Sequence, residues 1–245
     1  MRAALDEHRQ GGLTDKNLAV IRQILSGRLW PEVVRLPDEL MAEAEALKDH
    51  APVKAALRAQ LAVAIALLTC APVRVGNLVR SRLEENLIRP AGPDAPYWLV
   101  FPDYDVKNRV KLEFPLDEHV SELIERYVHE HRPALLRGSN DLWLFPGESG
   151  GYKTPSMFSD QITQAVLKAT GVRLTAHQFR HAAAALILQQ DPGNYEWVRR
   201  VLGHKNIQTT INFYIGLETT QASERFGRIV RQHASFGSYE GEARL

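Results

Sequence analysis

The chain has 245 residues, of which 44% are hydrophobic and 24% charged, and these proportions are typical of a globular protein with one sizeable core. Its net charge of +1 neither requires nor excludes nucleic acid, while its single cysteine, Cys70, excludes an internal disulfide framework and favours a cytoplasmic setting. The longest uncharged apolar run, Leu61 to Val73, is shorter than the roughly 18 residues of a membrane helix, and the N-terminus lacks a secretory signal, so we expect no membrane partner.

The first part of the chain predicts helices over residues 17–27 and 39–49. The stretch RLWPEVVRLP between them is bounded by prolines, which predict an interruption of the helix. From Pro52 onward, apolar residues recur with a period of 3.6. This pattern predicts a long buried helix that ends near Pro72.

The middle of the chain predicts a small sheet. Residues 77–87 indicate a helix that turns into a strand, and residues 97–101 and 110–114 indicate two strands joined by the polar turn DYDVKNR. Helical signals then recur at 117–131, 155–169, 176–190, 194–202, 206–215 and 218–232, with breaks at Pro133, Gly171, Pro192, Gly203 and Gly216. The predicted fold class is therefore mainly α with a small antiparallel β-sheet (α+β).

Two active-site motifs match in letters but not in context. The stretch GESGG around Ser149 matches the G-x-S-x-G elbow of serine hydrolases, but two glycines and Pro155 postpone the helix that must follow the serine, so a loop is predicted. The overlapping stretch GESGGYKT is similar to a phosphate-binding P-loop. There Tyr152 stands where a glycine must let phosphate approach the backbone, which argues against nucleotide binding.

The histidines at 177 and 181 have the i, i+4 spacing of a zinc site, but Arg180 between them would repel a metal, so we expect none. Thr175 instead predicts a helix cap, with His177 in the first turn and Arg180 one turn further on the same face. Such a helix N-terminus favours an anion. We assign His181 to the core behind Arg180.

The strings TAHQFRH and VLGHKNIQTTINFY resemble the second conserved block of the tyrosine recombinases, the phage integrase family. In that block His-x-x-Arg is followed by Leu-Gly-His and then by a nucleophilic tyrosine. The string APVRVGNLVRSRL resembles the first block and supplies Arg74, and Lys107 matches a lysine on the hairpin between the blocks. The resemblance covers about residues 50–232 and implies the catalytic-domain fold of this family.

The resemblance implies six catalytic residues: Arg74, Lys107, His177, Arg180, His204 and Tyr214. The arginines and histidines would bind the scissile phosphate, His177 would help to accept the tyrosine proton, and Lys107 would protonate the departing 5′ oxygen. Tyr214 would attack the phosphate to form a 3′-phosphotyrosyl link. The implied activity is site-specific recombination of double-stranded DNA by a homotetramer, without a metal, ATP or another cofactor.

The chain departs from the family pattern at two points. Asn77 stands where the family usually has an acidic residue, and the N-terminal part is shorter than in full-size members. We therefore interpret residues 1–50 as a helical lead-in, the remnant of or connection to a missing DNA-binding domain. Residues 51–232 are the expected catalytic domain and residues 233–245 a flexible tail. The helix over 218–232 could dock on a neighbouring protomer.

Several alternatives remain open from the sequence. A type IB topoisomerase uses a similar set of residues to relax DNA, and a catalytically silent DNA-binding module could keep the fold. A serine hydrolase would depend on Ser149 alone. Lys107 is the least secure site residue, because Lys111 lies on the same hairpin and Arg109 is close by.

Overall fold

The computed structural model describes residues 13–237, which form a mainly helical protein with a small antiparallel sheet. The predicted fold class is confirmed. The sheet has the order β1 (Leu87–Ile88), β2 (Trp98–Phe101) and β3 (Leu112–Pro115), and the strands lie within two residues of the predicted hairpin. Residues 1–12 of the predicted lead-in and 238–245 of the predicted tail lie outside the described part.

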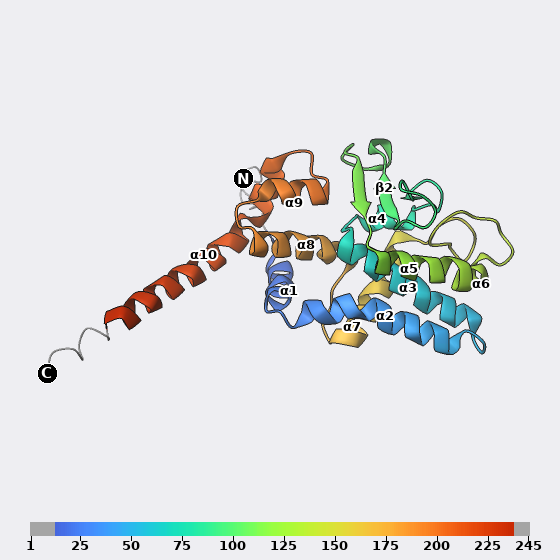
Figure 1. Cartoon of the computed structure of the whole chain (residues 1–245), viewed down its shortest axis with the longest axis horizontal. Helices are drawn as coiled ribbons and strands as arrows, with labels where there is room; N and C mark the ends of the chain where they lie inside the picture. The colour runs from blue at the N-terminus through green and yellow to red at the C-terminus, as the bar shows by residue number, and fades with distance from the viewer. Residues whose placement is uncertain (1–12, 238–245) are drawn as a thin grey trace, which may run out of the picture.

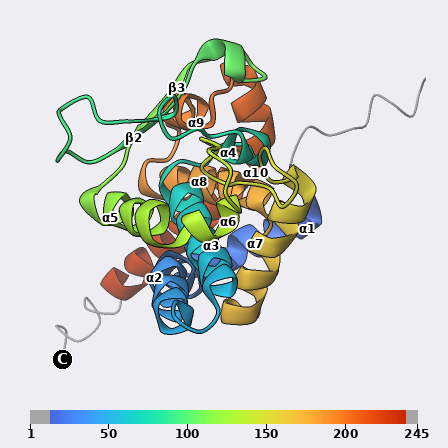
Figure 2. The same cartoon turned by 90° about the vertical axis from the view of Figure 1, so that its right-hand side faces the viewer.

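Helices make up most of the remaining structure. They are α1 (Asp15–Leu25), α2 (Leu29–Leu47), α3 (Pro52–Cys70), α4 (Val75–Val79), α5 (Glu118–Arg126), α6 (Pro133–Leu136), α7 (Pro155–Thr170), α8 (Ala176–Gln190), α9 (Tyr195–Leu202) and α10 (Ile207–Gly237). Figures 1 and 2 both show the sheet at one side of the molecule and α2 at the opposite side, with α8 between them. Figure 1 also shows α10 projecting away from the body of the protein.

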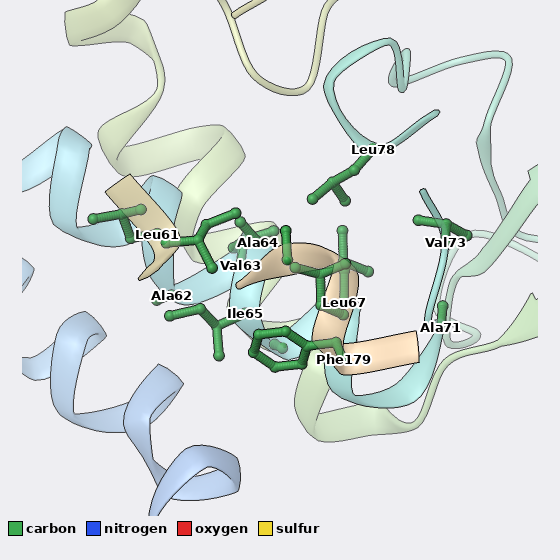
Figure 3. Packing of buried hydrophobic residues seen from close by; sticks show 14 of the residues in the cluster. Leu61, Ala62, Val63, Ala64, Ile65, Leu67, Ala71, Val73, Leu78 and Phe179 are labelled. Atoms are coloured by element: carbon green, nitrogen blue, oxygen red, sulfur yellow. The ribbon is translucent and has the colours of Figure 1, made fainter. Parts of the chain in front are cut away.

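Helix α3 forms the centre of the main core, as its apolar periodicity predicts. It begins at Pro52, where a helix needs no backbone donor, and most of its later residues are buried against neighbouring helices. Figure 3 shows Phe179 of α8 packed beside Ile65 and Leu67 of α3. The helix is long and apolar enough to cross a membrane, but 67% of this apolar stretch is buried inside the protein, which identifies it as a core helix.

The predicted interruption at RLWPEVVRLP is wrong, because α2 runs through both prolines. Pro31 lies in the first turn, where its missing N–H has no helical partner in any case. Pro37 lies inside the helix and removes one hydrogen bond. Val33 and Met41, on the face that packs into the core with α3, are almost fully buried, and this tertiary packing offsets the local cost.

The predicted break at Gly216 is also wrong, since α10 continues from Ile207 to Gly237. One glycine inside a helix costs only about 1 kcal/mol relative to alanine, which does not end a helix that has favourable residues on both sides. Gly203, by contrast, ends α9 as predicted. Its backbone is left-handed, with φ of 61°, and this conformation turns the chain toward α10.

A second, smaller core lies where α1, α8, α9 and the start of α10 meet. Its buried members are Ile21, Ala184, Ala185, Leu188, Val198, Leu202 and Tyr214. The lead-in helix α1 therefore contributes a fully buried side chain, Ile21, to the same cluster that encloses Tyr214. This packing joins the N-terminal segment to the part of the chain that carries the predicted nucleophile.

Candidate active site

The N-terminus of α8 has the predicted cap. The backbone N–H and the hydroxyl of Thr175 both donate to Oε1 of Gln178, at 2.8 Å and 3.0 Å. This cap fixes the first turn, in which His177 lies, and places Arg180 one turn further along. His177 is exposed, and desolvation of its ring, followed by the charges of Arg180 and Arg74, lowers its pKa. The imidazole is therefore neutral at pH 7 and able to accept a proton.

Only 3% of the surface of Arg180 is exposed, and its side chain holds two chain segments together. Its Nη1 donates to the carbonyl oxygen of Pro72 at 2.5 Å, and its Nη2 donates to that of Leu202 at 2.6 Å. Burial and the nearby Arg74 lower its pKa to about 10, which still leaves the guanidinium charged at pH 7. Two of its five N–H donors are used by these carbonyls, and the others remain for a further acceptor.

Arg74 and His177 line a cleft of about 710 Å³ between α4, the β2–β3 hairpin and α7. Arg74 is the N-cap residue of α4, with extended backbone, and burial lowers its pKa. The cleft also contains four further charged side chains, those of Arg80, Asp105, Lys107 and Arg109. The excess of positive charge makes this cleft suited to an anion such as a phosphate.

The hairpin reaches the cleft through contacts that the sequence does not reveal. Nδ2 of Asn108 donates to the carbonyl oxygen of Gly203 at 2.9 Å, which ties the hairpin to the corner between α9 and α10. Lys107 is exposed and lines the cleft, whereas Lys111 forms an ion pair with Glu113 at 2.7 Å. Of the two lysines, only Lys107 lines this cleft.

Asn77 acts on the hairpin as well. Its Nδ2 donates to the carbonyl oxygen of Asp105 at 3.3 Å, and its backbone carbonyl oxygen accepts from the hydroxyl of Ser81 at 3.4 Å. The amide thus connects α4 to the loop that carries Lys107. A carboxylate at this position could not donate to the Asp105 carbonyl oxygen.

His204 follows directly after the corner at Gly203 and is half-buried. Its Nδ1 lies 2.9 Å from Oγ1 of Thr210, and its carbonyl oxygen accepts from Nη1 of Arg199 at 3.0 Å. Burial, followed by the charges of Arg180, Arg74 and Arg199, lowers its pKa to about 4. The ring is neutral at pH 7, and its electrostatic coupling to both Arg74 and Arg180 places it in the same group of side chains.

Tyr214 does not line the cleft. Its side chain is 98% buried in the second core, and its hydroxyl lies 2.9 Å from Nδ1 of His181. Burial raises the pKa of the phenol, and the positive charge of Arg180 lowers it by a smaller amount. The predicted nucleophile is thus close enough to feel the charge of Arg180, but in this conformation the phenol is enclosed and protonated at neutral pH.

The structure therefore divides the six predicted site residues. Arg74, Lys107 and His177 line the cleft. Arg180 and His204 do not line it, but both interact electrostatically with Arg74. Tyr214 is enclosed next to His181. His181 is buried, as predicted, but it also contacts the predicted nucleophile. Sequence reasoning missed Arg80 as a cleft residue and Asn108 as the link to Gly203, although both lie close in sequence to residues that it did select.

The structure describes the segments of two motifs that the sequence analysis considered. The glycines around Ser149 form a turn, and α7 begins only at Pro155, so a nucleophile elbow is absent from this segment. The rings of His177 and His181 meet edge to face, with centroids 4.9 Å apart. Within residues 13–237, no group of three or more histidine, cysteine, aspartate or glutamate side chains could hold a metal ion.

Comparison with known proteins identifies the class. The sequence model of the phage integrase family matches residues 38–221, which make up well over half of the chain. The chain belongs to this family. The match begins inside α2 and ends within α10, so it includes both the cleft and the segment with Tyr214.

Individual relatives are tyrosine recombinases. Tyrosine recombinase XerD of Yersinia pestis is 27% identical over 213 residues, which cover 86% of this chain and 66% of the relative. The XerD protein of Proteus mirabilis is 31% identical over 121 residues, covering 49% of this chain and 37% of the relative. The fold is similar to that of the XerH site-specific recombinase, whose structure is a post-cleavage complex with a palindromic difH substrate. The TM-score is 0.56 and the sequence identity is 17%, over 78% of this chain and 51% of the XerH chain. The chain thus spans between about a third and two thirds of the lengths of these relatives.

Proposed function

We propose that this chain is the catalytic part of a site-specific DNA recombinase that cleaves and rejoins double-stranded DNA through a 3′-phosphotyrosyl intermediate. The observation that carries the proposal is the cationic cleft, in which Arg74, Lys107 and His177 meet although they lie up to about a hundred positions apart in the chain. Membership of the phage integrase family supports the same reaction class.

The residues at the cleft match the needs of phosphodiester cleavage without a metal. A guanidinium donates to two phosphate oxygens at once, so Arg74, with Arg180 behind it, would offset the negative charge that grows in the transition state. The contact between Lys111 and Glu113 supports Lys107 as the lysine that acts on the DNA. Lys107 is exposed on a hairpin, from which its ammonium group could reach the departing 5′ oxygen.

The proposed step exchanges one phosphate ester for another. The oxygen of Tyr214 attacks the phosphorus atom while its proton passes to neutral His177, and the bond from phosphorus to the 5′ oxygen breaks as Lys107 donates a proton. A 5′ hydroxyl of another strand can then reverse the step. Because the ester bond is conserved throughout, the reaction needs no ATP.

The phenol lies enclosed in the second core beside His181, so the helices that cover it have to open before DNA can reach its oxygen. Burial raises its pKa, and opening of this cover would lower the desolvation cost and favour the phenolate beside Arg180. The exposed apolar side chains of α10, Phe226, Ile229 and Val230, support contact with a neighbouring protomer, since a lone helix gains little by exposing them. We propose that the chain assembles as a homotetramer on DNA and that docking of α10 is coupled to the movement of Tyr214.

Trapping on nicked suicide DNA tests the proposal. A library of nicked duplexes with a randomised core is incubated with the wild-type chain, the Tyr214→Phe variant and the control variant Tyr97→Phe, whose hydroxyl bonds Glu125 away from the cleft. We expect covalent adducts with the wild type and with Tyr97→Phe, and none with Tyr214→Phe, which should still bind DNA. Peptide mapping should then place the DNA on Tyr214.

Each other outcome has a definite meaning. Adducts that survive in Tyr214→Phe, or DNA linked to Tyr104 in the cleft, would contradict the assignment of the nucleophile. DNA binding without any adduct would support a catalytically silent module. Relaxation of any supercoiled plasmid without joining of two specific sites would support an activity like that of type IB topoisomerases.

A further inference from the structure

A chain of hydrogen bonds runs from the cap of α8 through the lead-in helix α1 to the predicted nucleophile on α10. Nε2 of Gln178 donates to Oδ1 of Asn17 at 3.1 Å, and Nδ2 of Asn17 lies 3.4 Å from Nε2 of His181. Nδ1 of His181 lies 2.9 Å from the hydroxyl oxygen of Tyr214. Three helices thus meet in one polar path, which is partly buried at Asn17 and buried at His181 and Tyr214.

The direction of every bond in this path follows from its first donor. A backbone N–H can only donate, so the N–H of Thr175 requires the atom of Gln178 that faces it to be the carbonyl oxygen. The other end of the Gln178 amide must then be its NH₂ group, which makes the facing atom of Asn17 an oxygen. The NH₂ group of Asn17 consequently points at Nε2 of His181 and needs a lone pair there.

The remaining step concerns the imidazole ring. Burial and the positive charge of Arg180, with His177 and His204 nearby, lower the pKa of His181 to about 4, so the ring is neutral at pH 7 and carries one proton. Because Nε2 accepts from Asn17, that proton lies on Nδ1. The Nδ1–H group then donates to the oxygen of Tyr214.

We propose that His181 is a positioning residue for Tyr214, held by Asn17 of α1 in the tautomer that donates a hydrogen bond from Nδ1 to the phenolic oxygen. The inference rests on the proposed role of Tyr214 as the nucleophile. A donor at this position holds the phenolic oxygen beside Arg180 and favours its ionised form. It also means that His181 cannot take the tyrosine proton, which leaves that task to another group.

The path also gives α1 a function. Ile21 of α1 packs in the same buried cluster as Tyr214, and Asn17 lies one turn earlier on the same helix. The lead-in helix therefore supports the nucleophile twice, by apolar packing and by selecting the tautomer of His181. A movement of α1 would be transmitted to Tyr214 by this route.

The tautomer can be measured directly by a long-range proton–nitrogen NMR spectrum of the ¹⁵N-labelled full chain at mildly alkaline pH. His181 is assigned by the signals lost in His181→Asn. In the wild type we expect the proton on Nδ1. In Asn17→Asp a carboxylate can only accept, so Nε2 must become the protonated nitrogen and the tautomer should reverse. A wild-type proton on Nε2, or a tautomer unchanged in Asn17→Asp, would overturn the inference.

Adduct formation on the suicide DNA tests the effect on the nucleophile. His181→Leu removes the donor and should slow the adduct by roughly tenfold to a hundredfold, the factor typical of a hydrogen bond to a charged group. His181→Asn places an amide near the position of Nδ1 and should restore most of the rate. An unchanged or faster rate in His181→Leu, or an equally slow rate in His181→Asn, would contradict the positioning role.

The two experiments separate this inference from the proposed function. The NMR spectrum requires no DNA and no activity, so the tautomer is decided even if the chain is not a recombinase. Adducts that persist in Tyr214→Phe would reject the nucleophile while leaving the measured tautomer unaffected. A wild-type His181 proton on Nε2, together with the expected loss of adducts in Tyr214→Phe, would reject the positioning role alone.

Discussion

Replacing Arg180 with methionine separates its structural role from its proposed catalytic role. The change removes the charge and both hydrogen bonds to the Pro72 and Leu202 carbonyl oxygens, while a flexible side chain of similar length fills most of the space. The variant should therefore fold but lose the guanidinium at the cleft.

The magnitude follows from two opposing terms. Hydrogen bonds from a charged donor contribute about 1.5 to 3 kcal/mol each, so the loss of two costs about 3 to 6 kcal/mol. Keeping the guanidinium charged in a site that lowers its pKa to about 10 costs about 3 kcal/mol, and the variant is relieved of this penalty. We expect the free energy of unfolding to fall by only about 0 to 3 kcal/mol.

Urea denaturation measures this change, and suicide DNA measures adduct formation in the same preparation. We expect the folded Arg180→Met variant to form adducts at least about a hundredfold more slowly, as is typical when one donor to a transition state is lost. A folded variant with wild-type adduct formation would refute the phosphate role. A loss of unfolding free energy above about 3 kcal/mol would show that the two terms do not offset each other.

Three further predictions concern the hairpin and the buried histidine. Gly203→Ala should lower the free energy of unfolding by at least about 1 to 2 kcal/mol in urea denaturation, because its backbone is left-handed and the new Cβ would lie 2.6 Å from the Leu112 side chain. Lys107→Ala should slow adduct formation on suicide DNA by roughly a hundredfold, and Lys111→Ala should leave it near the wild-type rate. The folded structure lowers the pKa of His181 from 6.5 to about 4, so between these pH values the folded state binds fewer protons than the unfolded state. This contribution to stability should be complete above pH 6.5 and should fall by up to about 3 kcal/mol as the pH drops toward 4. Denaturation at each pH measures the change.

Each of these predictions has a control. Gly27→Ala tests the backbone cost alone, since Gly27 is also left-handed and a Cβ there would meet no atom within 4 Å. Equal losses in the two glycine variants would argue against the clash. The slope of stability against pH should become shallower in His181→Asn, and an unchanged slope would assign the acid sensitivity to other groups. Equal effects of the two lysine variants would remove the distinction between them.

Local patterns in the sequence were sufficient for the elements whose stability is local. The structure has the apolar periodicity of α3, the turn between β2 and β3 and the cap at Thr175. Each of these patterns involves residues that are close to one another in the sequence. The sequence failed at α2, where burial of Val33 and Met41 offsets the cost of Pro37. That gain depends on α3, which no window around Pro37 contains.

The candidate site divides in the same way. The types of its residues and their order along the chain already indicated the family and predicted phosphate chemistry. The bond from Asn108 to Gly203 and the path through Asn17 join residues that are about 95 to 165 positions apart. The enclosure of Tyr214 depends on side chains from several helices. Such contacts are decided by the packing of complete helices against one another, so only the tertiary structure could specify where Tyr214 lies and which side chains contact it.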